Sequence, residues 1–263
     1  MIVMEHAKQG SLRKLLDSKY NDLNWKHKLI ILHYIANGLN TIHKPKLMHK
    51  DFHTGNIVNG NIVNSYITDF GLCKPVSQES NSEDIFGVLP YIAPEALHGE
   101  KYTQESDIYS FGIIMSEVCT GYPPYYDISH DEDLASKICL GYRPEIKCEV
   151  PRLLLDLMNK CLDAEPQNRP AAKELVNILG IFNSSLDNEQ TELYKQVEEI
   201  EGSSKNSNQV ISTQLLNYQT HKQAIYTSRF LKYRNLPKPT NAKPIVAGKK
   251  SSNKNIGLKV LFS

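Results

Sequence analysis

Apolar residues recur at helical spacing in two long segments of the chain. Asn24 is a suitable N-cap, and the apolar positions that follow it at steps of three or four residues are Trp25, Leu29, Leu32, Ala36 and Leu39. This pattern predicts a helix with one buried stripe that ends near Lys44-Pro45. Residues 103–120 are apolar on nearly all sides and precede Gly121, which predicts a central helix enclosed by its neighbours.

Shorter elements surround these two helices. Helices are predicted at residues 134–140, 152–161 and 171–179, the last with Pro170 in its first turn. The runs Ile57-Val58, Ile62-Val63 and Tyr66-Ile67-Thr68, interrupted by Asn59-Gly60, predict small hairpin pieces. The expected fold class is therefore mainly α (α+β), with little sheet.

The pattern changes near Phe182, where we place the end of a domain spanning residues 1–182. Within residues 183–201, apolar residues at helical spacing predict a short amphipathic helix that ends at Gly202; they are Leu186, Leu193, Val197 and Ile200. Residues 202–263 carry eleven Lys and Arg and no Asp or Glu, which leaves 19 basic and 29 acidic residues in 1–201. We expect this basic tail to be largely disordered. Its basic and aromatic part, residues 224–233, suits nucleic acid, an acidic partner or the acidic domain itself.

Composition excludes several classes of protein. The 263 residues are 40% hydrophobic and 22% charged, enough to bury an ordinary core. Five Cys residues without a C-x-x-C pair indicate neither a disulfide framework nor a structural zinc site. The N-terminus lacks a basic region followed by a long apolar one, and no run approaches 18 uncharged apolar residues. We therefore expect a cytoplasmic protein without a membrane partner.

The candidate catalytic residues lie at the ends of the short predicted strands. The run His49-Lys-Asp-Phe-His-Thr-Gly-Asn56 is followed after twelve residues by Asp69-Phe-Gly71. Phosphoryl transfer needs a carboxylate that deprotonates the attacking hydroxyl and oxygen ligands that hold Mg²⁺ on nucleotide phosphates. Asp51, Asn56 and Asp69 supply that set, although each alone is also an ordinary turn residue.

Several ordered motifs make residues 1–179 resemble eukaryotic protein kinases. They are H-K-D-F-x-x-x-N at 49–56, Asp69-Phe-Gly71, Ala93-Pro94-Glu95, Ser106-Asp107-Ile-Tyr-Ser-Phe-Gly112 and Arg169-Pro170. The resemblance implies the large lobe of a kinase and the cofactors ATP and Mg²⁺. It makes Asp51 the catalytic base, Asn56 a ligand of one Mg²⁺, and Asp69 the ligand that joins Mg²⁺ to the phosphates.

The resemblance also assigns nucleotide contacts and structural roles. Residues 1–7 resemble the last small-lobe strand and the hinge, with Met4 as gatekeeper, the Glu5 and Ala7 backbones at the adenine, and Val58 beneath it. His49 and Phe70 are expected to stack. Glu95 and Arg169 are expected to form a buried ion pair, and Asp107 to hold the backbone of the 49–56 loop.

The sequence differs from the family pattern in the residues that hold the ATP phosphates and in those that mark the choice of substrate hydroxyl. No G-x-G-x-x-G loop and no strand Lys precede the hinge-like residues, so we expect a truncated small lobe and a chain that is inactive alone. Lys50 replaces the usual Arg, and His53 and Val88 replace the Lys and Thr that mark serine/threonine kinases. Ser77, Ser80 and Ser82 lie in a candidate activation loop.

Two functions are compatible with these features. The first is a protein kinase that transfers the γ-phosphate of ATP to protein hydroxyls, Ser or Thr rather than Tyr. The alternative is a kinase-like scaffold or pseudokinase fragment that binds proteins. The partners we expect are a protein substrate and a regulatory protein bound to the C-terminal tail, and not nucleic acid.

Overall fold

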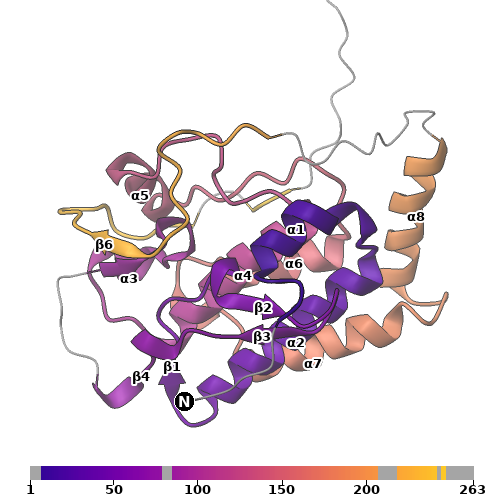
Figure 1. Ribbon diagram of the computed structural model, residues 1–263, viewed down its shortest axis with the longest axis horizontal. Coiled ribbons are helices and arrows are strands. Elements are labelled where there is room, and N and C mark those ends of the chain that lie inside the picture. The colour runs from indigo at the N-terminus through magenta and orange to yellow at the C-terminus, as the bar shows by residue number, and fades with distance from the viewer. Residues whose placement is uncertain (1–6, 79–84, 207–217, 242–243, 247–263) are drawn as a thin grey trace, which may run out of the picture.

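The computed structural model describes residues 7–78, 85–206, 218–241 and 244–246. Its α-helices are α1 (Leu12–Lys19), α2 (Trp25–His43), α3 (Pro94–His98), α4 (Gln104–Thr120), α5 (Glu132–Cys139), α6 (Arg152–Cys161), α7 (Ala172–Ser185) and α8 (Glu192–Asn206). Its strands are β1 (Leu47–Met48), β2 (Ile57–Asn59), β3 (Ser65–Ile67), β4 (Lys74–Pro75), β5 (Ile85–Gly87) and β6 (Arg229–Leu231). They form the antiparallel pairs β1–β4, β2–β3 and β5–β6. The mainly helical α+β class is confirmed (Figure 1).

Helix α2 follows the sequence pattern at both ends. The side chain of Asn24 accepts a hydrogen bond from the His27 amide at 2.9 Å, which satisfies an amide that the helix itself leaves unpaired. The helix ends at His43, before Lys44. Its apolar stripe is buried, and the helix packs along α7 and against α4 and β3.

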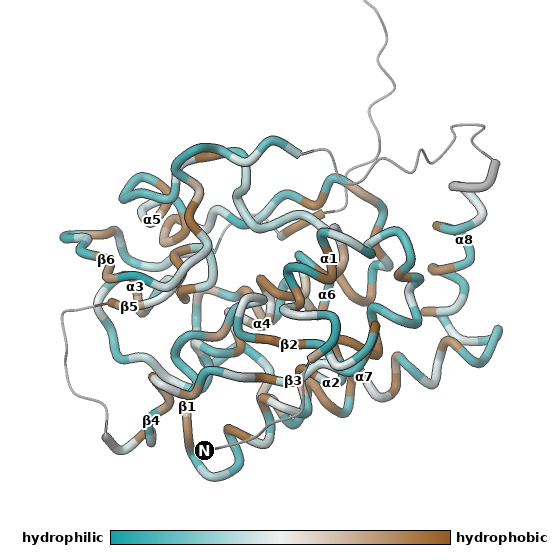
Figure 2. The backbone as a smooth tube through the Cα atoms, in the orientation of Figure 1, coloured by the Kyte–Doolittle hydropathy of each residue, from teal (hydrophilic) through white to brown (hydrophobic). Residues whose placement is uncertain are grey.

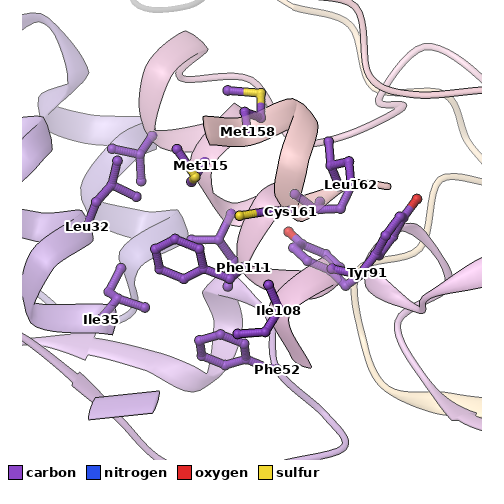
Figure 3. Close-up of a cluster of buried hydrophobic side chains, with 14 of the residues drawn as sticks. Leu32, Ile35, Phe52, Tyr91, Ile108, Phe111, Met115, Met158, Cys161 and Leu162 are labelled. Carbon is purple, nitrogen blue, oxygen red and sulfur yellow. The ribbon is translucent and has the colours of Figure 1, made fainter. Parts of the chain in front are cut away.

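Helix α4 is the centre of the core, as its all-round apolar sequence predicts. Every residue from Ser106 to Thr120 is buried, and Gly121 ends the helix in a left-handed conformation. A Cβ atom at Gly112 would lie 2.8 Å from the Leu162 side chain, so only glycine allows α6 to approach this closely. Figure 3 shows the core around Phe111, with Cys161 and Leu162 of the α6 end beside it. The hydropathy colours of Figure 2 place brown segments on the inner parts of the helices.

Two local predictions were wrong in detail. Ile62-Val63 is not a strand, because the Asn61 side chain accepts hydrogen bonds from the Val63 and Asn64 amides and closes a turn instead. Helix α8 continues through Gly202 to Asn206, since one glycine costs a helix only about 1 kcal/mol.

The bounds of helix α7 also differ from the prediction. Pro170 precedes the N-cap residue of α7 and is not in its first turn. Helix α7 runs past residue 182 to Ser185, and Leu186 caps α7 instead of belonging to the next helix. The sequence pattern did not reveal α1, which begins after the Ser11 N-cap and buries Leu12, Leu15 and Leu16.

Residues 218–241 of the basic tail are packed against the domain. The tail crosses the surface near α5 and pairs as β6 with β5, close to α3 (Figures 1 and 2). Leu231 is 3% exposed and Leu236 7% exposed, and both belong to the main hydrophobic cluster. Among the described helices, none combines the length and the apolar character needed to cross a membrane.

Candidate functional site

The loop of residues 49–56 is anchored to helix α4 by hydrogen bonds. Asp107, fully buried near the start of that helix, accepts hydrogen bonds from the His49 amide at 2.8 Å and the Lys50 amide at 3.1 Å. The ring of His43 lies 2.9 Å from the same carboxylate. Lys50 has a positive φ of 71°, a strained conformation that these contacts maintain. The expected role of Asp107 in holding this backbone is confirmed.

A second buried carboxylate, Glu95 of α3, is paired as expected. The Arg169 guanidinium donates two parallel hydrogen bonds to it, each 2.7 Å long, and neither side chain is more than 3% exposed. Arg169 also donates to the backbone oxygen of Glu105 in α4. The pair therefore links α3 and α4 to the segment that precedes α7.

A third buried carboxylate, Glu117 of α4, was not predicted from the sequence. It accepts hydrogen bonds from the Thr54 and Tyr91 hydroxyls and pairs with Arg13 of α1 at 2.5 Å. Burial raises the pKa of Glu117, although Arg13 and the hydroxyls act in the opposite direction. An acidic residue in the apolar second half of the helix was the available signal, because such a group requires partners when it is buried.

Asp51 lies at the centre of the candidate site. Asn56 donates through its Nδ2 atom to the backbone oxygen of Asp51 at 2.9 Å and to the Oδ2 atom at 3.2 Å. Among the described residues, the Oδ1 atom has no hydrogen-bond donor, and the Nε2 atom of His53 lies 3.6 Å from it. Burial acts to raise the pKa of Asp51, but interactions with His53, Ser228 and Asn56 outweigh it and the pKa is lowered. Asp51 is therefore a carboxylate at neutral pH.

A hydroxyl from the tail is placed directly on this carboxylate. The Oγ atom of Ser228 donates a hydrogen bond to Oδ2 of Asp51 at 2.5 Å and lies 3.3 Å from Nε2 of His53. The Nδ1 atom of His53 accepts from the Gly55 amide, so the proton of the neutral ring is on Nε2. His53 therefore donates to Ser228, and Ser228 donates to Asp51.

Asp69 follows β3 and is joined to the 49–56 loop through its neighbour. The amide and the hydroxyl of Thr68 donate to the backbone oxygen of Asn56, at 2.8 Å and 3.0 Å. Asp69 has a positive φ of 60°, is exposed, and its carboxylate makes no hydrogen bond with another described residue. The side-chain Nδ2 atom of Asn56 bonds Asp51. The side-chain oxygen of Asn56 and the carboxylate of Asp69 therefore remain as oxygen ligands that suit Mg²⁺. The described residues contain no group of three or more His, Cys, Asp or Glu side chains around one point.

The structure describes only some of the residues predicted to stack or to contact the adenine. The rings of His49 and Phe70 are neighbours, 5.7 Å apart and tilted, but Phe70 is 54% exposed. Met4 and Glu5, predicted at the adenine, lie outside the described residues, as do Ser80 and Ser82. Ala7 is described at the start of a segment that runs along β2, where the amide of Gln9 donates to Asn59 at 3.0 Å. Val58 of β2 is half-buried there.

Comparisons with known proteins agree with this geometry. The family model described as protein tyrosine and serine/threonine kinase matches residues 1–179. The chain is 30% identical over 188 residues to "Putative serine/threonine-protein kinase/receptor R831" of Acanthamoeba polyphaga mimivirus, covering 71% of this chain and 12% of that protein.

Two animal proteins are similar to the same region. The mitogen-activated protein kinase kinase kinase nsy-1 of Caenorhabditis elegans is 32% identical, over 70% of this chain and 13% of that protein. The receptor-interacting serine/threonine-protein kinase 4 of Mus musculus is 33% identical, over 67% of this chain and 24% of that protein. The chain thus spans a quarter or less of the length of these relatives. With its buried Glu95–Arg169 pair and its Asp107-anchored loop, the chain belongs to the protein tyrosine and serine/threonine kinase family.

Proposed function

We propose that this chain carries the catalytic and substrate-binding part of a protein kinase that phosphorylates Ser or Thr hydroxyls with Asp51 as the base. The observation that carries the proposal is the 2.5 Å hydrogen bond from the Ser228 hydroxyl to the Asp51 carboxylate. A base for phosphoryl transfer must lie within hydrogen-bond distance of the proton that it accepts, and Asp51 meets that requirement for an aliphatic hydroxyl.

The surrounding residues prepare Asp51 for this role. Its lowered pKa keeps it ionised, and Asn56 fixes both its backbone and its carboxylate. His53 donates to the attacking oxygen and thereby orients the hydroxyl toward the carboxylate. His53 occupies the position where serine/threonine kinases usually have Lys, so we assign it the orientation of the hydroxyl.

We assign the metal and nucleotide contacts to residues that supply suitable atoms. Asn56 and Asp69 would hold Mg²⁺ through oxygen atoms, and the ion neutralises the phosphate charge that develops during transfer. The Glu5 and Ala7 backbones, with the Met4 side chain, would contact the adenine, and Val58 would pack beneath it. These roles follow from the family resemblance of the positions.

We base the preference for Ser or Thr over Tyr on how far the hydroxyl oxygen that contacts Asp51 lies from its own Cβ atom. The acceptor oxygen there is one bond beyond Cβ, on a residue adjacent to strand β6. A tyrosine oxygen extends several ångströms farther from Cβ; the hydroxyl of Tyr226, two residues before Ser228, bonds the backbone oxygen of Pro124 at 2.9 Å and not Asp51. The names of the relatives also describe serine/threonine kinases.

Residues that clamp ATP phosphates in the family do not precede the hinge-like segment within these 263 residues. We therefore propose that residues 1–263 alone transfer no phosphate. Activity is to be measured on residues 1–263 preceded in register by a kinase small lobe, which we call the completed chain. Serine, threonine and tyrosine versions of one basic peptide serve as acceptors, and we expect transfer to serine and threonine. Equal or faster transfer to tyrosine would contradict the specificity, and a protein-binding module would phosphorylate none of them.

The metal assignment has its own measurement. In the completed chain, Asp69→Ala removes the charged metal ligand, so ATP affinity measured by calorimetry should fall at least tenfold with Mg²⁺ present. Without Mg²⁺ the variant and the parent should bind ATP alike. Asp156→Ala, which removes an exposed carboxylate of α6, is the control. Unchanged Mg²⁺-dependent affinity in Asp69→Ala would exclude Asp69 as a ligand.

A further inference from the structure

We propose that residues 218–241 are an intramolecular substrate, with Ser228 as the residue that receives the phosphate. They lie along β5 and Asp51, where a protein substrate would bind, and we call this site the substrate groove. We call residues 218–241 the C-terminal strap. The proposal rests on the kinase function proposed above, and it adds the identity of one acceptor and the chemical class of others.

The backbone of the strap enters the site as an added strand. β6 pairs antiparallel with β5, so that Leu231, Phe230 and Arg229 lie opposite Ile85, Phe86 and Gly87. Gly87 borders the base, since a Cβ atom built on it would lie 3.5 Å from the Oδ1 atom of Asp51. Strand addition of this kind is a common way to bind an extended peptide, because backbone hydrogen bonds hold it in a fixed register. That register places Ser228, the residue before β6, at Asp51.

Side chains on both sides of Ser228 anchor the strap. Toward the N-terminus, the Tyr226 ring packs edge-on against His130 at 4.9 Å. Toward the C-terminus, Arg229 donates to the backbone oxygen of His130 at 2.6 Å, and Leu231 and Leu236 are buried. Beyond them, the amide of Ala164 donates to the Asn241 side chain at 2.7 Å.

Ser228 is distinguished from the neighbouring hydroxyls of the strap. The Tyr226 hydroxyl bonds Pro124, and Thr227 is exposed. Only Ser228, among the described hydroxyls, donates to the Asp51 carboxylate. A segment that served only to cover apolar surface would need Leu231 and Leu236 but no hydroxyl on a catalytic base. The contact therefore indicates a substrate and not merely a structural brace.

The opposite charges of the strap and of the domain also favour the strap as the occupant of the substrate groove. The strap carries five basic residues and no acidic one, whereas residues 1–201 contain 29 acidic and 19 basic residues. The domain and the strap therefore attract one another at long range. Of the three partners left open for the basic aromatic segment, the acidic domain of the same chain is the one that the strap contacts.

The transfer step follows from the geometry once a nucleoside triphosphate is bound. The Oγ atom of Ser228 attacks the γ-phosphorus while its proton passes to Asp51. A bond forms between Oγ and phosphorus, the bond from phosphorus to the bridging oxygen breaks, and the nucleoside diphosphate leaves. Phosphoserine then carries a charge of about −1.5 to −2 next to the Asp51 carboxylate, and this repulsion favours departure of the strap.

The strap also defines the class of acceptors that would bind in trans. The contacts at Tyr226, Arg229 and Leu231 predict serine peptides with an aromatic residue two positions before the serine, a basic residue directly after it and an aliphatic residue three positions after it. A peptide with the sequence of residues 222–234 contains all three features.

The first experiment requires no catalytic activity. Hydrogen exchange is measured in residues 1–263 and in two variants, Leu231→Asp, which places a charge in the buried anchor, and Ser228→Glu, which places one beside Asp51. Val246→Asp makes the same chemical change as Leu231→Asp at a residue that is 74% exposed. We expect exchange in peptides covering β5 to accelerate at least tenfold in the first two variants and to be unchanged in the third. Amides of α2 report whether the domain remains folded. Equal β5 exchange in the parent, Ser228→Glu and Val246→Asp would overturn occupation of the groove.

The second experiment tests transfer with the completed chain and the 222–234 peptide. We expect mass spectrometry to find phosphate on Ser228 in both, and a Ser228→Ala peptide to lose at least 95% of the signal. A Thr227→Ala peptide should be phosphorylated at the parent rate. Phosphate on an unrelated serine peptide but not on Ser228 would overturn the acceptor role. Absence of phosphate from every acceptor would contradict the proposed function and the transfer step together, while the exchange result decides occupation of the groove separately.

Discussion

Asp51 shows how much of the candidate site could be predicted at the level of single residues. Its order with Asn56 and Asp69 along the chain led to the proposed chemistry, and the structure brings Asn56 to its carboxylate. The contact with Ser228 could not be predicted, because the two residues are 177 positions apart and no local pattern encodes their meeting. Glu117 was missed for a similar reason, since its partners come from three other segments.

The Ser228 contact predicts a change in the titration of Asp51. Ser228→Ala removes one hydrogen bond to the carboxylate, whereas Leu231 and Leu236 still anchor the strap, so the pKa of Asp51 should rise. Because the folded-state pKa is lowered, ionised Asp51 stabilises the fold above its unfolded pKa of about 4, and this contribution is lost as the pH falls through the folded value. In Ser228→Ala this contribution should be smaller, and its loss should be complete at a higher pH than in the parent.

Carboxyl titration by NMR on residues 1–263 measures this change. Thr227→Ala, which removes an exposed neighbouring hydroxyl, should leave the titration of Asp51 as it is in the parent. An Asp51 pKa that is the same in Ser228→Ala and the parent would mean that the serine hydroxyl is not bonded to the carboxylate in solution.

At the level of elements, prediction was best where periodicity and caps agreed. Helices α2, α4 and α6 were located to within a residue or two. The Asn24 N-cap marks the start of α2 and Gly121 marks the end of α4, whereas α6 has neither feature and was located without them. Helix α1 and strand β6 were missed. Both are short, and the burial of β6 depends on β5, which is distant in sequence.

Two helical glycines differ in the space around them, so we predict opposite effects of replacing them with alanine. Gly112 lies at the close contact between α4 and α6, whereas Gly180 lies in α7 with more room. Gly112→Ala should lower the free energy of unfolding by about 1–3 kcal/mol, because its methyl group would overlap Leu162 and Cys161. Gly180→Ala in α7, where the nearest atom would be 3.6 Å away, should be neutral or raise it by up to about 1 kcal/mol. Denaturant unfolding of residues 1–263 tests both. A Gly112→Ala variant as stable as the parent would mean that α4 and α6 are farther apart than described.

At the level of the whole molecule, the acidic domain and the basic strap form one unit although they differ in composition. The charge asymmetry was evident in the sequence, but it was equally compatible with a disordered tail or an external partner. What decides between them is packing: two buried leucines and the β5–β6 pair hold the strap on the domain. Such long-range packing is not encoded in local sequence patterns.

If the strap occupies the substrate groove, its removal should favour external substrates. In the completed chain, Leu231→Asp should lower the KM for a basic serine peptide at least fivefold, because the peptide no longer competes with a tethered segment. Val246→Asp should leave the KM at the parent value. An unchanged or increased KM in Leu231→Asp would show that the strap and the peptide do not share a site.

The most direct test of the kinase account is the effect of Asp51→Asn in the completed chain. The measurement is transfer of labelled phosphate from ATP to a serine peptide at matched nucleotide occupancy. Loss of a general base typically slows a reaction by about 10²–10⁴-fold, so we predict a loss of at least a hundredfold with nearly unchanged ATP affinity. Transfer at a rate close to that of the parent chain would contradict the assignment of Asp51 and, with it, the proposed mechanism.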